Sequence, residues 1–158
     1  MFLVVAILCI ACNEDNIPSE YSLSSSKDNG FSFDRMNVVN NQIASQIYTD
    51  FIVVAGLNET GEFTSPFFTQ LEFKTYFVLS KQFDNLQSAQ QYFDSYTKMS
   101  ENESYFDISA LPVQPYQIWI VKTQSNTYGK ILILSTINYS SNHSTYCTVR
   151  FKAEILKK

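Results

Sequence analysis

Residues 116–156, YQIWIVKTQSNTYGKILILSTINYSSNHSTYCTVRFKAEIL, contain three apolar runs that are separated by two short polar segments. Aromatic and β-branched residues dominate each run, and these are the residue types that strands favour. The polar segments have the length and the residue types of hairpin connections. The sequence therefore predicts a C-terminal three-stranded antiparallel meander. Its expected strands are residues 116–123, 130–139 and 145–156.

The third run alternates apolar and polar side chains, which places Cys147, Val149 and Phe151 on one face of its strand. We expect this face to lie in the core together with Ile131 and Ile133 of the preceding strand. Cys147 is then a buried thiol with a structural role rather than a nucleophile.

Two further strands and one helix are predicted upstream of the meander. Residues 48–55 (YTDFIVVA) and 71–80 (LEFKTYFVLS) have the composition of strands, and residues 65–68 (SPFF) are expected to form a loop that packs aromatic rings on the core. Over residues 85–98 the apolar side chains recur at helical spacing, with Asp84 placed to cap the helix. The expected fold class is α+β, mostly antiparallel β, with one helix packed on a sheet.

The chain begins with an apolar stretch, MFLVVAILCIA at residues 1–11, that ends just before Cys12. It is shorter than the roughly 20 apolar residues that a membrane span needs, and it fits the about 7–15 residues of a secretory signal peptide. The alternative is a buried strand or helix of the domain. Ala11 before Cys12 resembles the bacterial lipobox, in which the cysteine is lipidated, and the acidic residues that follow resemble the surface-export signal of Bacteroidetes lipoproteins. We expect a lipid anchor on Cys12 and a location at the surface of the outer membrane.

Composition divides the rest of the chain into a tether and one domain. Residues 12–29 combine the cysteine to be lipidated with acids, serines and a proline, a composition that is typical of a flexible spacer. Residues 30–158 carry the strand and helix patterns and are long enough for a single β-rich domain with its own core.

Charge and motif content exclude two classes of function. The formal net charge is −4, and the sequence has no basic patch of the kind that nucleic-acid binding requires, so nucleic acid is not an expected partner. The chain holds one histidine and lacks the nucleophile, zinc and phosphate-binding motifs of common enzymes. We therefore expect a protein that is not an enzyme and has no catalytic residues.

Four segments suggest a family. They are Phe31-Ser32-Phe33, Trp119–Thr123, Tyr128–Leu134 and Val149–Lys152. In order and content they resemble the HmuY-like surface lipoproteins of Bacteroidetes over about residues 30–155, and the W-x-V-K-T and Y-G-K-I-x-I hairpin is the most specific part. The resemblance implies a mostly antiparallel β fold. It also implies haem as a ligand, because the best-known members bind haem through two axial histidines and some relatives use methionines.

This chain departs from that pattern in its single histidine, His143. One chain cannot supply two axial histidines, so haem would need His143 together with Met36 or Met99, or the His143 side chains of two chains. The residues therefore predict no cofactor, and haem is a ligand that the resemblance alone suggests.

Two classes of function are left. In the first, the protein is a surface binding module for a small nutrient, haem or a glycan. The candidate ligand-contacting residues are then His143, Trp119 and Tyr116, because aromatic rings stack on sugars and porphyrins. In the second, the protein is a structural or protein-interaction module of an envelope assembly, since the same aromatic residues are common at interfaces. In either case we expect Trp119 to be at least partly buried.

Replacing Cys12 with alanine should abolish lipidation and release the protein from the membrane, because Cys12 is the predicted attachment point. In the wild-type protein, mass spectrometry of the N-terminal peptide should show acyl chains on Cys12 and no residues 1–11. An alanine variant that stays in the membrane fraction would contradict this prediction. So would a wild-type protein that keeps residues 1–11 attached.

Overall fold

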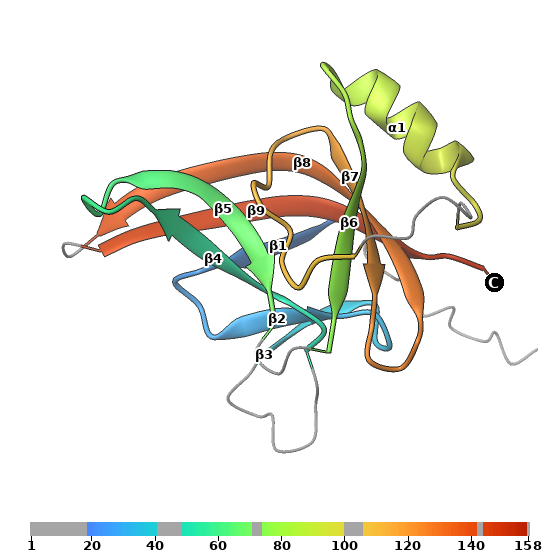
Figure 1. The fold of residues 1–158 in the computed structure, drawn as a ribbon, viewed down its shortest axis with the longest axis horizontal. Helices are drawn as coiled ribbons and strands as arrows, with labels where there is room; N and C mark the ends of the chain where they lie inside the picture. Colours follow the sequence, from blue (N-terminus) through green and yellow to red (C-terminus); the bar gives the residue numbers. More distant parts are fainter. Residues whose placement is uncertain (1–18, 41–48, 71–73, 100–105, 142–143, 158) are drawn as a thin grey trace, which may run out of the picture.

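Five antiparallel strands, in the order β1-β9-β8-β7-β6, form the central sheet (Figure 1). The structure is a computed structural model that describes residues 19–40, 49–70, 74–99, 106–141 and 144–157. The strands of the sheet are Tyr21–Ser24 (β1), Tyr76–Gln82 (β6), Gln117–Lys122 (β7), Tyr128–Ser141 (β8) and Ser144–Ile155 (β9). Two hairpins pack on one face of this sheet. The first consists of Asn29–Ser32 (β2) and Asn37–Asn40 (β3). The second consists of Ile52–Leu57 (β4) and Phe63–Thr69 (β5). Helix α1, Leu86–Ser95, packs on the other face.

The predicted fold class is confirmed, because the described residues form mostly antiparallel sheet with a single short helix. The C-terminal meander is present as β7, β8 and β9, and the two upstream strands are present with shifted bounds as β4 and β6. Residues 71–73, where the second of these was expected to begin, lie outside the described residues. The predicted core positions and Cys147 are all fully buried. They are Ile131, Ile133, Cys147, Val149 and Phe151.

The structure corrects the predicted tether. The sequence predicts a flexible spacer over residues 12–29, but the last part of it contains β1, in which Tyr21 lies opposite Phe151 of β9. The tether prediction is therefore wrong from Tyr21 onward. An alternation of four residues is too short to distinguish from a polar linker, whereas burial of Tyr21 and Leu23 stabilises the strand in the folded chain. The tether up to residue 18 lies outside the described residues.

A strand also replaces the loop predicted at residues 65–68. Strand β5 contains Pro66, and a proline usually argues against a strand because it has no N–H to donate. Here β4 is the single strand with which β5 pairs among the described strands, so the other edge of β5 needs no N–H at this position. The carbonyl oxygen of Pro66 still accepts a hydrogen bond from the N–H of Val113 at 2.9 Å. The loop prediction is therefore wrong, although its aromatic Phe68 is in the core as expected.

Helix α1 starts one residue later than the predicted cap. Its N-cap is Asn85 and not Asp84, because the side-chain oxygen of Asn85 accepts a hydrogen bond from the N–H of Ser88 at 2.9 Å. Both are residue types that cap helices well, so the sequence alone does not decide between them.

The helix is attached to the sheet by apolar contacts and by one buried cation. Ala89 and Phe93 are fully buried against β7 and β8. Lys130 of β8 is 2% exposed, and its ammonium group donates hydrogen bonds to the carbonyl oxygens of Phe93 and Tyr96. The same group pairs with the Glu154 carboxylate at 2.9 Å. The C-terminal end of a helix carries partial negative charge, so the cation lies where the helix dipole favours it. The predicted packing of one helix on a sheet is confirmed.

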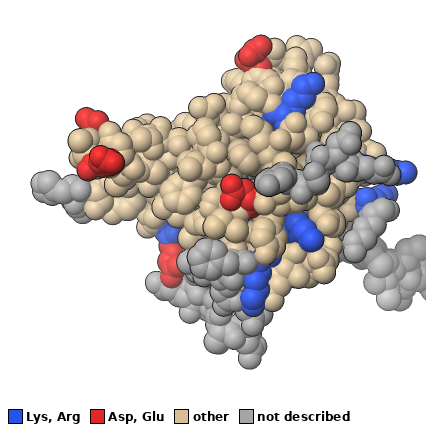
Figure 2. Space-filling model, in the orientation of Figure 1, with Lys and Arg blue, Asp and Glu red and all other residues tan. Residues whose placement is uncertain are grey.

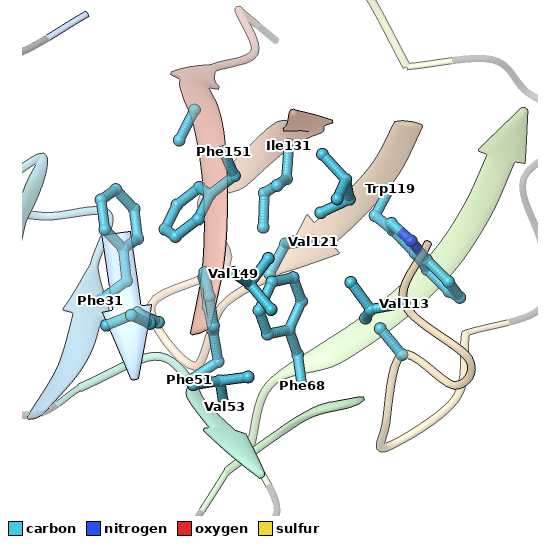
Figure 3. Packing of buried hydrophobic residues seen from close by; sticks show 14 of the residues in the cluster. Phe31, Phe51, Val53, Phe68, Val113, Trp119, Val121, Ile131, Val149 and Phe151 are labelled. Atoms are coloured by element: carbon cyan, nitrogen blue, oxygen red, sulfur yellow. The ribbon is translucent and has the colours of Figure 1, made fainter. Parts of the chain in front are cut away.

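An aromatic cluster between the sheet and the two hairpins forms the main core (Figure 3). Phe151 of β9 contacts aromatic rings from four other segments, with ring centroids 5.3 to 5.9 Å apart. These rings belong to Tyr21, Phe31, Phe51 and Phe68. Tilted and edge-to-face contacts at such distances add to the stabilisation that burial of apolar area supplies. The cluster therefore joins the sheet to both hairpins.

A bulge in β8 changes which of its residues face this cluster. Ile133 pairs with Phe151, but the next residue of β9, Arg150, pairs with Ser135 and skips residue 134. The extra residue in β8 shifts the alternation of its side chains by one position. Before the bulge the odd-numbered residues are in the core. Beyond it, the odd-numbered Ile137 and Tyr139 lie on the opposite face and are 57% and 39% exposed. The outer half of the β8–β9 hairpin therefore presents apolar and aromatic side chains to solvent.

Replacing Phe151 with alanine should lower the free energy of unfolding by about 3–5 kcal/mol, because the change removes a fully buried ring and leaves a cavity. The matched control is Ile137→Ala on the exposed face of the same hairpin, which should change it by less than about 0.5 kcal/mol. Urea denaturation of both variants measures the difference. Equal midpoints for the two would contradict the assigned core face.

Candidate functional site

An open groove of about 470 Å³ lies between β5, the segment that precedes β7, and β8. Its walls combine apolar side chains and prolines with hydroxyl and amide groups. The lining residues are Phe63, Thr64, Ser65, Pro66, Val113, Gln114, Pro115, Tyr116 and Thr136. Because Tyr116 is one of the residues that the sequence predicts to contact a ligand, this groove is the candidate functional site.

Backbone hydrogen bonds hold two walls of the groove together. The N–H of Val113 donates to the carbonyl oxygen of Pro66 at 2.9 Å, and Phe68 and Ala110 exchange two hydrogen bonds of 3.0 and 3.1 Å. These bonds join the segment before β7 to the edge of β5 that does not pair with β4, and Figure 1 shows the two running next to each other. The groove is therefore built on fixed backbone and not on a free loop.

Tyr116 has an unusual backbone conformation, with a φ of 68° in the left-handed region that bulky side chains rarely adopt. Its N–H donates to the carbonyl oxygen of Ile133 at 2.8 Å, and its own carbonyl accepts from the N–H of Phe83 at 3.2 Å. Such a conformation costs on the order of 1–3 kcal/mol and is frequent at functional sites. The half-buried side chain also packs against the small cluster beneath α1. Tyr116 thus connects the groove to the helix side of the sheet.

None of the residues that line the groove carries a charge. Figure 2 shows an uncharged expanse between the acidic side chains at the end of the β4–β5 hairpin and the charged side chains near α1. Apolar walls with hydroxyl and amide groups can hold a neutral ligand through contact area and directed hydrogen bonds. The lining contains no carboxyl, imidazole or amino group.

The structure does not bring the predicted ligand-contacting residues together. Trp119 is 4% exposed in the main core, and its indole N–H donates to the side-chain oxygen of Gln117 at 2.9 Å. Figure 3 shows the indole at one end of the core cluster. The predicted burial of Trp119 is confirmed, and this burial leaves no ring face for a ligand. His143 and the predicted lipidation site Cys12 lie outside the described residues.

The groove lacks the axial ligands that most haem proteins use. Its lining contains no histidine, methionine or cysteine, which are the common axial ligands of haem iron. Of the two candidate methionines, Met36 lines a different cavity of about 500 Å³ at the end of β9, and Met99 follows α1 as a half-buried residue. No step of haem binding is therefore derived from this groove.

Sequence reasoning missed most of the groove because its walls come from distant parts of the chain. Phe63 and Pro66 belong to β5, Gln114 and Pro115 precede β7, and Thr136 belongs to β8. Each of the first two segments places a proline near an aromatic residue, which is a local signal for a rigid, non-helical backbone. No pattern in the sequence shows that these segments lie side by side.

Among the described carboxyl groups, that of Asp50 has a clearly perturbed pKa. Burial raises the pKa of Asp50 from 3.8 to about 6, and the negative charge of Asp34 acts in the same direction. The hydrogen bond that its Oδ2 accepts from the N–H of Phe33, at 2.6 Å, opposes both effects. Asp50 is not part of the groove. It affects stability and its pH dependence, and it does not contribute to the binding chemistry.

Two other kinds of site are not found in the part of the chain that the structure describes. No three His, Cys, Asp or Glu side chains are grouped there as a metal ion would require. No helix there is both long enough and apolar enough to cross a membrane.

Comparison with protein-family models, with curated proteins and with solved structures finds no match to this chain. The functional proposal therefore rests on the groove and on the sequence.

The folded state should lose stability as the pH rises from about 4 to about 6, because the raised pKa means that the folded protein holds the Asp50 proton more tightly than the unfolded chain does. Asp50→Asn keeps a side-chain oxygen for the Phe33 N–H and removes the ionisation. At pH 7.5 this variant should be more stable than the wild type by on the order of 1–3 kcal/mol, and at pH 3.5 the difference should vanish. Urea unfolding at the two pH values measures the difference in stability between the variant and the wild type. An equal difference at pH 7.5 and pH 3.5 would contradict the prediction.

Proposed function

We propose that this chain is a lipid-anchored protein of the outer-membrane surface and that its folded part is a binding module for a small neutral nutrient. The sequence supports the anchor through the apolar residues 1–11, Ala11 and Cys12. The groove between β5, the segment before β7 and β8 supports the binding role. A glycan unit is the ligand class that suits this groove best.

The observation that carries the binding proposal is the pairing of uncharged polar groups with an apolar wall. A sugar presents apolar C–H faces and many hydroxyl groups, so it needs both kinds of surface in one site. Phe63, Pro66 and Pro115 supply apolar contact, while Gln114 and Thr136 supply hydrogen-bonding groups. The volume of about 470 Å³ is within the roughly 300–1,000 Å³ of small-molecule sites.

A second candidate function, that of a protein-interaction module, is favoured by the outer half of the β8–β9 hairpin. Ile137 is 57% exposed there, and Tyr139 is 39% exposed. The rings of Tyr139 and Tyr146 pair across the two strands with centroids 5.6 Å apart. Exposed aromatic residues on a projecting hairpin are a common feature of protein interfaces. This surface is separate from the groove, so the two functions can be tested with different substitutions.

Gln114→Ala should weaken binding of the recognised sugar about 5- to 20-fold, because it removes one or two hydrogen bonds between the groove and the sugar. Gln114 is exposed and its backbone bonds to Gln117 do not depend on its side chain, so the fold should be unchanged. The measurement is calorimetric titration of the full chain with a panel of neutral mono- and oligosaccharides. Thr136→Val provides a second variant in another wall of the groove.

The matched control is Tyr139→Ala, which removes an exposed ring outside the groove and should leave sugar affinity unchanged. If Tyr139→Ala abolishes binding and Gln114→Ala does not, the β8–β9 hairpin is the binding surface and the proposal for the groove is wrong. Titration with haemin tests the ligand suggested by the resemblance. A Soret shift that His143→Ala removes, with no response to any sugar, would replace the glycan proposal with haem.

A further inference from the structure

The two ends of the molecule differ in charge. One end, named here the distal end, consists of the β4–β5 turn and the outer half of the β8–β9 hairpin. Its turn carries Glu59 and Glu62, and the described residues 54–65, 136–141 and 144–148 contain no lysine or arginine. In Figure 2 acidic side chains lie at the left end of the molecule, where Figure 1 places the β4–β5 turn, and other acidic side chains are seen elsewhere in the view.

The opposite end, named here the basal end, is assembled from segments that are far apart in the sequence. Ser125 Oγ lies 3.5 Å from the Asp34 carboxylate, which joins the turn after β7 to the turn between β2 and β3. The N–H of Leu156 donates to the carbonyl oxygen of Tyr128 at 2.8 Å, which places the end of the chain beside the start of β8. Ser19 lines one cavity together with the last residues of β9. The chain therefore enters the fold at this end.

Cations outnumber carboxylates at the basal end. Its basic residues are Arg35, Lys122, Lys130, Lys152 and Lys157. Its acidic residues are Asp34, Asp50, Asp94 and Glu154. The Glu154 carboxylate is already paired with Lys130 at 2.9 Å, so it does not neutralise the other cations. In Figure 2 most of the blue side chains are in the right and lower parts of the view, away from the acidic end.

The chain length between Cys12 and Ser19 limits how far a lipid anchor is from this end. Ser19 already lines a cavity of the basal end, so the seven peptide units from Cys12 to Ser19 are the connection to it. A chain of this length spans at most about 25 Å even when fully extended. A tether of the length that the sequence predicts would let the domain turn freely, but this shorter connection holds the basal end near the membrane.

We infer that the basal end rests on the anionic, phosphate-bearing headgroups of the membrane that holds Cys12, with the distal end pointing away. This inference depends on the lipid anchor of the proposed function. Lysine and arginine side chains are attracted to an anionic lipid surface when they are within about 8 Å of it at physiological ionic strength. The acidic distal end is repelled by the same surface. The two effects together select one orientation of the domain.

The orientation has a consequence for the groove. Its lining includes Thr136, which belongs to β8 beyond the bulge, and Phe63, at the start of β5 beside the β4–β5 turn. Both are in the part of the molecule that leads to the distal end. The groove is then open to the medium when the basal end is against the membrane.

Lysine labelling tests which surface the membrane shields. Lipidated full-length protein is reconstituted into phosphatidylcholine vesicles that contain phosphatidylglycerol, labelled with a water-soluble amine reagent, and analysed by mass spectrometry. Lys122 and Lys157 should be labelled about threefold more slowly than in the Cys12→Ala chain free in solution. Lys27, in the turn after β1, and Lys81, beside the Tyr92 ring of α1, should be labelled at unchanged rates. Equal protection of all four lysines, or stronger protection of Lys27 and Lys81, would overturn the inference.

Charge variants distinguish the electrostatic attraction of the basal end to the lipid headgroups from the restraint that the short connection to Cys12 imposes. Arg35→Gln combined with Lys122→Gln should restore most of the labelling of Lys157 on anionic vesicles. Lys27→Gln combined with Lys81→Gln is the matched control, with the same change in net charge, and should leave the protection of Lys157 unchanged. An equal effect of the two pairs would show that net charge, and not the position of the cations at the basal end, governs the protection, and the headgroup contact would be rejected.

The same digest distinguishes a failure of the anchor from a failure of the orientation. Acyl chains on the N-terminal peptide report directly on Cys12. If they are missing, the Cys9→Ser chain can be coupled through Cys12 to a maleimide phospholipid in the vesicles, because Cys147 is fully buried and does not compete. The labelling pattern of the coupled protein then decides the orientation, whatever the natural attachment is.

Discussion

The contact of the Phe151 ring with four other aromatic rings is the interaction on which the rest of the structure depends. Phe151 belongs to β9, which pairs with β8 on one side and with β1 on the other. The rings that it contacts come from β1, from β2, from the residue just before β4 and from β5. Isolated two-stranded hairpins are marginally stable in water, so β2–β3 and β4–β5 need this shared burial to keep their place on the sheet. The groove depends on it too, because β5 forms one of its walls.

The sequence predicts this fold where a pattern extends over many residues and fails where pairing partners decide. The long alternating run that ends the chain identifies β9 and the core positions of Val149 and Phe151, because every second side chain repeats the same choice. Strand β1 has only four residues, and it is a strand because β9 is beside it. Strand β5 contains Pro66, whose effect depends on which edge of the strand is paired. A local sequence pattern does not show which distant segments pair with each other.

The candidate site shows the same limit. Tyr116 is predicted from its residue type, and the structure places it in the lining of the groove with a left-handed backbone. Trp119 has the same kind of side chain, but its position on β7 turns the indole into the core. One residue earlier or later on a strand reverses the face, so residue type alone cannot separate a ligand contact from a core residue. Gln114 and Thr136 have no signal at all in the sequence, since their role comes from the meeting of three segments.

The native fold protects the thiol of Cys147 from oxidation. Its thiol is fully buried, and burial raises its pKa, so in the native protein it is neither accessible nor ionised. Each global unfolding event exposes it, and in an oxidising compartment an exposed thiol can form a disulfide with another chain. Such a covalent dimer cannot return to the native state until it is reduced. Loss of the core is then irreversible under oxidising conditions, and the lifetime of the protein is set by its unfolding rate and not by its equilibrium stability.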